Sequence, residues 1–166
     1  VWEGVVAIDL LLKLRYEFRP YEVRQGATEE AYQRGLSVIE EAVRQGGGRR
    51  LFGALDCIAA DFDGIGGDRS TRRPVVAMLG EIYVMLNAPS NQELILQLEA
   101  SGAEVVTGTL TEWFHFADET KMDRDVLFGS WVSLLGTKAL SVHQRRVEHQ
   151  MFARVRRLMR QPLDPP

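Results

Sequence analysis

RPVVAMLGEIYV, residues 73–84, is the stretch that decides the fold. Its apolar run Val75–Leu79 lies between a proline and a glycine, which is typical of a strand buried on both faces in a parallel sheet. A predicted helix over 91–100 and a second short strand, Glu104–Val106, follow it. The order predicts a βαβ unit, whose ligand side lies at the carboxyl end of the first strand, in the loop that begins at Gly80.

Helices are predicted on both sides of this unit, because apolar residues recur at steps of three and four. The predicted helices cover 2–18, 28–45 and 49–62 before it, and short helices near 110–117 and 126–135 and a long one over 138–159 after it. We therefore expect an α/β fold, a three-layer Rossmann-like domain with a small, mostly parallel sheet and flanking helical segments.

Three parts are expected in one compact domain. They are an N-terminal helical segment (1–66), the βαβ core with its Gly-Glu-Ile-Tyr-Val motif (67–118) and a C-terminal helical extension (119–166). Because the chain begins with Val1 rather than Met, we expect it to be excised from a longer polypeptide.

Composition excludes several classes of protein. The 166 residues carry a formal net charge of −3, which argues against a nucleic-acid binder. One cysteine excludes a disulfide framework, and with three histidines it predicts no metal site. The absence of a long apolar run or a leader pattern argues against membrane insertion and secretion, so a cytoplasmic location is expected. Cys57 is expected to be a small buried residue, and His115 a packing residue.

A longer motif resembles one known family. RPVVAMLGEIYV continues through Leu86-Asn87 to LEASGAEV at 98–105, and RPYE at 19–22 and IDL at 8–10 precede it. Together they resemble the 2-hydroxyacyl-CoA dehydratase family, and more narrowly the dehydratase-like region that follows CoA-enzyme activase domains in large fused proteins. The resemblance covers about residues 1–113.

That resemblance implies redox chemistry in a parent protein. In the family, tandem α/β domains hold an iron-sulfur cluster on cysteines, and an activase dimer injects an electron at the expense of ATP. The electron serves dehydration of a 2-hydroxyacyl-CoA, or ring reduction in the related benzoyl-CoA reductases. This chain has no cluster cysteines and no Gly-rich phosphate loop, so the cluster and the ATP site are expected in the parent and no cofactor here. The isolated chain is expected to be inactive.

Four candidate residues lie in the loop after the first strand. Glu81 is the candidate catalytic residue, because a carboxylate at this edge can exchange protons, although it can equally cap a helix. Gly80, Tyr83 and Asn87 accompany it as expected cleft residues, with core filling and turn formation as the alternatives for the last two.

A second group of candidate residues precedes the second predicted helix. The guanidinium of Arg19 suits a phosphate or carboxylate, and Tyr21 and Glu22 follow it across a proline. The same loop can instead fasten one helix to the next.

The expected partners are the rest of a larger polypeptide or a sister subunit, an activase dimer and an acyl-CoA substrate, with no nucleic acid and no membrane. In the first hypothesis the chain forms part of the substrate or cluster cleft of a dehydratase-like enzyme. In the second it is a non-catalytic domain that docks an activase or a sister subunit through its C-terminal helices, with an exposed apolar or Arg-rich patch as its signature. A third hypothesis is a small nucleotide- or CoA-binding α/β module.

Overall fold

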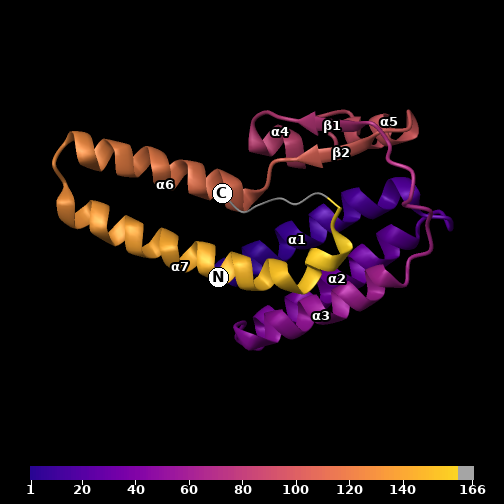
Figure 1. Cartoon of the computed structure of the whole chain (residues 1–166), viewed down its shortest axis with the longest axis horizontal. Coiled ribbons are helices and arrows are strands. Elements are labelled where there is room, and N and C mark those ends of the chain that lie inside the picture. Colours follow the sequence, from indigo (N-terminus) through magenta and orange to yellow (C-terminus); the bar gives the residue numbers. More distant parts are fainter. Residues whose placement is uncertain (161–166) are drawn as a thin grey trace.

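The computed structural model describes residues 1–160, apart from the side chains of Ile82 and Leu86. Most of this chain is helical, and only two short strands occur in it (Figure 1). The elements are α1 (Trp2–Phe18), η1 (Arg19–Tyr21), α2 (Ala27–Arg44), α3 (Arg49–Asp63), β1 (Val75–Met78), α4 (Ile82–Leu86), α5 (Leu94–Ala100), β2 (Glu104–Thr107), α6 (Leu110–Leu127), α7 (Trp131–Val155) and η2 (Arg156–Leu158).

The predicted three-layer Rossmann-like fold is wrong. The expected βαβ unit does form, and β1 pairs with β2 in parallel, with Val75 opposite Glu104. Within residues 1–160, however, the sheet has no third strand. Two strands cannot provide the central layer that helices would cover on both faces, so the main core forms between helices instead.

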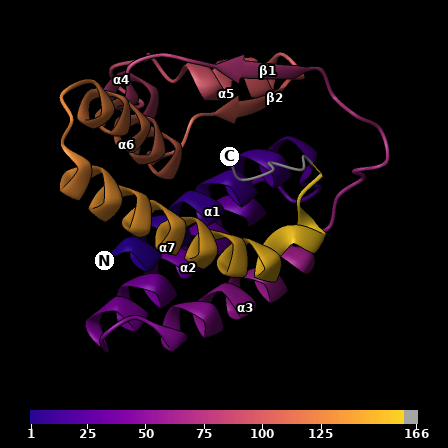
Figure 2. The same ribbon diagram turned by 60° about the vertical axis from the view of Figure 1, so that its left-hand side comes forward.

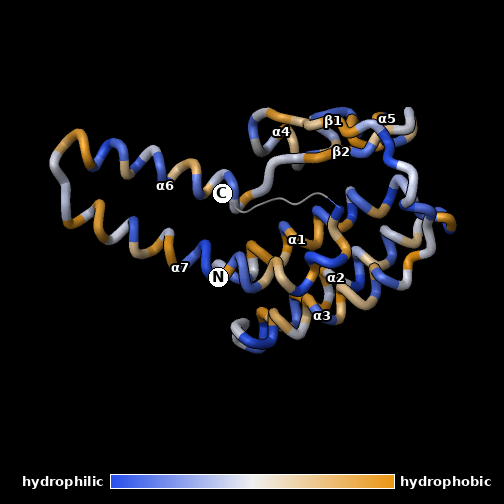
Figure 3. Tube along the Cα trace, viewed as in Figure 1, coloured by the Kyte–Doolittle hydropathy of each residue, from blue (hydrophilic) through white to orange (hydrophobic). Residues whose placement is uncertain are grey.

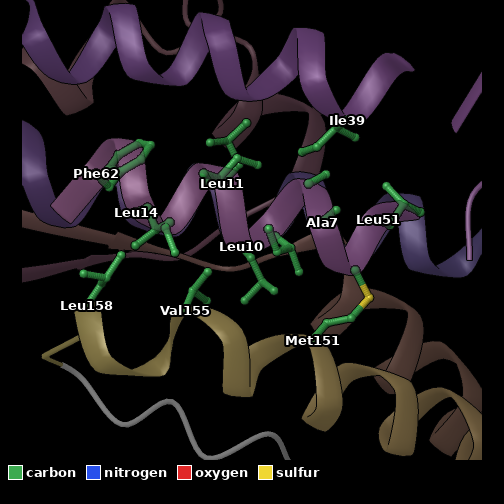
Figure 4. Packing of buried hydrophobic residues seen from close by; sticks show 14 of the residues in the cluster. Ala7, Leu10, Leu11, Leu14, Ile39, Leu51, Phe62, Met151, Val155 and Leu158 are labelled. Atoms are coloured by element: carbon green, nitrogen blue, oxygen red, sulfur yellow. The ribbon is translucent and has the colours of Figure 1, made fainter. Parts of the chain in front are cut away.

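That core lies where α1 is enclosed by α2, α3 and the second half of α7 (Figure 4). The apolar face of α1 places Leu11 and Leu14 at its centre, where both are fully buried. From α3 the side chains of Leu55 and Phe62 meet them, and from α7 the side chain of Met151. Helices that are far apart in the sequence therefore share one hydrophobic core.

The βαβ unit packs on the opposite side of α1 from α3 (Figure 2). The inner strand, β2, is almost entirely buried, and a small second cluster joins its Val105 to Tyr16 of α1 and Ile95 of α5. Alternate residues of β1, by contrast, are exposed, starting with Val75. The expectation that the run Val75–Leu79 forms a strand buried on both faces is thus wrong, and it is β2 that is buried in this way.

The connection between α3 and β1 is fastened to η1. Gly67 forms an antiparallel bridge with Glu22, and a Cβ at Gly67 would lie 2.3 Å from the carbonyl oxygen of Tyr21. A glycine is required here because the two backbones approach so closely.

Helices α6 and α7 form a hairpin whose far end projects from the body, which is the part built from α1, α2, α3 and the βαβ unit (Figure 1). Sequence periodicity predicted short helices near 110–117 and 126–135, whereas α6 is one helix of 18 residues and α7 one of 25. A capping box at Thr109 begins α6, and the turn between the helices contains Gly129 in the left-handed conformation. The last six residues of the expected C-terminal extension lie outside the described range.

Candidate functional site

Glu81, the predicted catalytic residue, is the N-cap of the short helix α4. Its carboxylate accepts a hydrogen bond from the backbone N–H of Val84 at 3.1 Å, and the residue is exposed. This is the ordinary arrangement of a helix cap. Gly80 and Tyr83 beside it are also exposed, and Asn87 ends α4 in a turn, where its Oδ1 accepts from the backbone N–H of Ser90.

Arg19, the first residue of η1, joins the end of α1 to α5. Its Nε and Nη2 atoms donate to the two carboxylate oxygens of Glu99 at 2.6 and 2.9 Å, and both side chains are largely buried. The guanidinium also lies beside the ring of Tyr16. This two-point geometry is the one in which Arg would hold a ligand carboxylate, but here the carboxylate belongs to the chain.

Tyr21 and Glu22 point to two different elements. The hydroxyl of Tyr21 donates to Glu104 of β2 at 2.8 Å and accepts from the backbone N–H of Arg73 at 3.0 Å. The carboxylate of Glu22 accepts from the backbone N–H groups of Gly26 and Thr28, both at 2.7 Å, and so caps α2. The predicted cleft residues of this loop each hold a separate part of the fold.

A small pocket lies between the end of α1 and the α4–α5 segment. Its volume is about 80 Å³, and Arg19, Met85 and Asn91 are among its lining residues. Of the seven predicted site residues, Arg19 lines it, whereas Glu81 and Tyr83 do not. The structure therefore does not bring the predicted residues into one cleft.

The α6–α7 hairpin shows a different organisation, which begins with polar contacts between its two helices. Lys121 of α6 donates to Asp125 at 3.0 Å and to Ser133 of α7 at 2.9 Å, and it also contacts Thr137. Ser133 in turn donates to Asp125 at 2.7 Å. The hydrogen bonds from Ser133 and Lys121 lower the pKa of Asp125.

Closer to the body, the contacts between the two helices are still polar. His115, only 3% exposed, lies 2.7 Å from the carboxylate of Glu148 through its Nε2 atom, with its ring against that of Trp2. Between these two groups of contacts, Ser141 donates to Asp118 at 3.3 Å. The inner faces of the hairpin are thus polar and satisfied largely by each other.

Large apolar side chains lie on the outer faces of the same two helices. Leu127 of α6 is 78% exposed, and Val132 and Leu135 of α7 are 88% and 67% exposed. The hydrophobic colouring near the far end of the hairpin marks this region (Figure 3). On α7 these residues follow one another at steps of three and four, whereas on α6 polar residues such as Thr120 and Asp123 separate Phe116 from Leu127. The α6 stripe comprises Trp113, Phe116 and Leu127, and the α7 stripe Val132, Leu135, Ala139 and Val142.

The two helices carry opposite charges. Helix α6 has five acidic and two basic residues, a net charge of −3, while α7 has four basic and one acidic, a net charge of +3. The one acidic residue of α7, Glu148, faces inward to His115. Sequence reasoning offered an exposed apolar or Arg-rich patch on the C-terminal helices as one hypothesis, but it did not say which residues form the patch. The sequence signal that could have identified these residues is the stripe of polar residues on the opposite face of each helix.

Two further predictions concern cysteine and metal ligands. Cys57 was expected to be buried and is exposed, because the buried face of α3 is formed by Ala54, Leu55 and Ile58. Over the described part of the chain, no group of three or more His, Cys, Asp or Glu side chains is arranged to hold a metal ion. None of the helices in this part is long and apolar enough to cross a membrane.

Comparison with known proteins found no matching family model, no matching curated protein and no matching solved structure.

Proposed function

We propose that this chain is a non-catalytic docking domain that binds another polypeptide through the outer faces of its α6–α7 hairpin. The observation that carries the proposal is the reversed arrangement of this hairpin. Its polar residues, such as Lys121 and Asp125, lie between the helices, and its large apolar residues, such as Leu127 and Leu135, lie outside.

The reversal matters because apolar surface gains free energy only where water is removed from it. A helical hairpin that functions alone places its apolar residues between its helices. Burial of apolar surface contributes roughly 25 cal/mol per Å², and the outer faces of this hairpin do not gain that free energy while they face water. Exposed apolar surface marks interaction sites where it is gathered, and tryptophan and phenylalanine, such as the exposed Trp131 and Phe128 at the end of the hairpin, are residues enriched in such interfaces.

The inner contacts suit the hairpin for docking by making it rigid. The Lys121–Asp125–Ser133 group and the His115–Glu148 pair lie at different heights along the hairpin and fix the register of α6 against α7. A preformed surface loses less conformational entropy on binding than a flexible one.

The resemblance to 2-hydroxyacyl-CoA dehydratases supplies the class of partner. We propose a sister subunit, an activase dimer or another part of the same polypeptide, in an assembly where the cluster and ATP are held elsewhere. The helix-cap bond of Glu81 supports docking over a role in the reaction, because its carboxylate already has a structural partner.

The test measures the native size of the assembly in the source cell. The chain is first detected on a denaturing gel, to learn whether it is part of a polypeptide larger than 18.7 kDa. The polypeptide is then run on a native gel as the wild type and as the double variant Leu127→Asp with Val132→Asp. We expect the wild type in an assembly larger than its denatured mass and the variant outside it. If the chain is part of a longer polypeptide that contains the partner, the expected result is faster proteolytic cleavage of the hairpin in the variant.

A matched control keeps this test specific. Val23 is 81% exposed and lies in a loop outside the hairpin, so Val23→Asp adds the same charge elsewhere. It should behave as the wild type in both assays. An unchanged assembly and unchanged proteolysis in the hairpin variant would contradict the proposal.

A further inference from the structure

We infer that the polypeptide segment covering the outer face of α7 is an acidic amphipathic helix. This inference rests on the proposed docking function and names the partner of that same surface. It is argued from the spacing of the α7 stripe and from the charges around it.

The spacing of the α7 stripe is that of a helix–helix seam. Val132, Leu135, Ala139 and Val142 follow one another at steps of three, four and three, all exposed. Apolar residues at alternate steps of three and four are the pattern with which one helix packs along another. The small Ala139 in the middle leaves room for the partner helix to approach closely.

The charges around the stripe select the sign of the partner. Residues 131–147 contain no acidic side chain, but they contain Lys138, Arg145 and Arg146. Lys138 and Arg146 are exposed, while Arg145 reaches Glu119 on α6. A partner helix with glutamate or aspartate flanking its apolar stripe would meet complementary charge along this face.

A lipid surface fits the arrangement less well than a helix. The α6 and α7 stripes lie on opposite sides of the hairpin, because the inner faces of both helices are occupied by the contacts between them. A bilayer surface covers one side only, so a membrane bound at the α7 stripe would leave the α6 stripe exposed, and the acidic residues of α6 would repel anionic lipids from that second side. Separate helices can pack on both sides.

A second copy of the chain is also disfavoured. Two α7 helices packed against each other would place basic residues against basic residues. Packing of α6 from one copy on α7 of the next would match in charge, but such a head-to-tail contact joins two copies through different surfaces and leads to rings or fibres of many copies, which sedimentation would detect as a concentration-dependent mass.

The experiment uses the full chain and a designed peptide as the probe. The peptide is a helix of about three heptads with leucine at the seam positions and glutamate around them, labelled with fluorescein. Its matched control is the same peptide with lysine in place of glutamate. Binding is followed by fluorescence anisotropy at low and high salt. The chain is tested as the wild type, as Leu135→Asp, as Lys138→Glu with Arg146→Glu, and as the Val23→Asp control, each checked by circular dichroism.

The expected result is saturable binding of the glutamate peptide and none of the lysine peptide. Leu135→Asp should weaken binding about tenfold or more, as loss of a central interface residue does. The double charge variant should prefer the lysine peptide, and salt should weaken both contacts. Val23→Asp should bind like the wild type.

Three results would overturn the inference. They are equal binding of both peptides, binding to vesicles of phosphatidylcholine and phosphatidylserine in place of the peptide, and a concentration-dependent mass in sedimentation that Leu135→Asp abolishes. If one of these results is found while the Leu127→Asp, Val132→Asp variant is still lost from the assembly in the cell, the inference of an acidic helix is wrong and the docking function stands. If the assembly also stays unchanged, both are wrong.

Discussion

The body and the hairpin of this molecule use the same secondary structure in opposite ways. In the body, Leu14 of α1 and Phe62 of α3 are fully buried between helices, while charged residues such as Glu30 lie outside. In the hairpin, Asp125 and His115 are buried between helices and Leu127 lies outside. The comparison teaches that a helix with an apolar and a polar stripe can bury either stripe against its neighbours. Where the polar stripe is buried, as in the hairpin, the apolar stripe still lacks a partner within the described chain.

The largest expected difference between the two regions comes from removing one leucine in each. Leu55 is fully buried in the body, and Leu135 is 67% exposed on the hairpin. Leu55→Ala should lower the free energy of unfolding by about 2–5 kcal/mol, because it leaves a cavity in a packed core. Leu135→Ala should change it by less than about 0.5 kcal/mol. Urea denaturation of both variants measures the difference, and a similar loss in both would mean that the Leu135 face is covered in the isolated chain.

A smaller effect is expected where the two regions are joined. The carboxylate of Asp9 in α1 is buried and accepts from the backbone N–H groups of Leu110 at 3.3 Å and Thr111 at 2.8 Å, at the beginning of α6. Asp9→Ala should cost about 1–3 kcal/mol, because it leaves these N–H groups without their acceptor. Hydrogen exchange should rise in the first turn of α6. The control is Asp56→Ala, whose exposed pair with Arg154 is expected to contribute less than about 1 kcal/mol.

Acid should affect the two regions with opposite sign. Burial raises the pKa of Asp9 above its ordinary value, only partly offset by its hydrogen bonds from Thr111 and Leu110. Its contribution to stability is therefore complete at pH values below the ordinary pKa and is lost as the pH rises through the folded-state pKa. Hydrogen bonds lower the pKa of Asp125, so its contribution is present above the ordinary pKa and is lost as the pH falls through the folded-state pKa.

The measurement is the unfolding free energy of the wild type minus that of Asp9→Asn and of Asp125→Asn, followed as the solution is acidified. As the pH falls, the difference for Asp9→Asn should grow in favour of the wild type, and the difference for Asp125→Asn should shrink. Carboxyl chemical shifts give the two pKa values independently. Slopes of the same sign would mean that Asp9 and Asp125 have similar surroundings, which would remove the contrast between the body and the hairpin.

The sequence predicts the local elements of this fold well, but it does not predict how these elements pack into layers. The apolar run at 75–79 and the helix signals after it led to a parallel βαβ unit, and β1 and β2 are paired in that way. The predicted helix over 49–62 is α3, one residue longer. The three-layer fold was wrong because the existence of a third strand depends on long-range pairing, which a short apolar run does not specify.

The candidate site was the hardest part to predict, because its residues have distant partners. Tyr21 forms a hydrogen bond with Glu104, 83 residues later in the chain, and Arg19 forms one with Glu99, 80 residues later. Nothing in the RPYE motif itself indicates these contacts. In the hairpin, the polar residues from Asp118 to Asp125 show no apolar period, so α6 was expected to end near 117. Its second half is stabilised by Lys121 and its partners on α7.

The smallest expected effect on stability comes from replacing Glu81, the predicted catalytic residue. Glu81→Gln keeps an oxygen that can accept from the backbone N–H of Val84, so the free energy of unfolding should change by less than about 0.5 kcal/mol. Glu81→Ala removes the acceptor and should cost about 0.5–1 kcal/mol at most, because α4 is short and Glu81 exposed. If the chain is part of a dehydratase-like enzyme with an iron-sulfur cluster, as the resemblance implies, the Gln variant should leave both its turnover and its cluster spectrum unchanged. A loss of turnover with Gln, at unchanged stability, would assign Glu81 a role in proton transfer, since the cap is the one contact that Gln preserves.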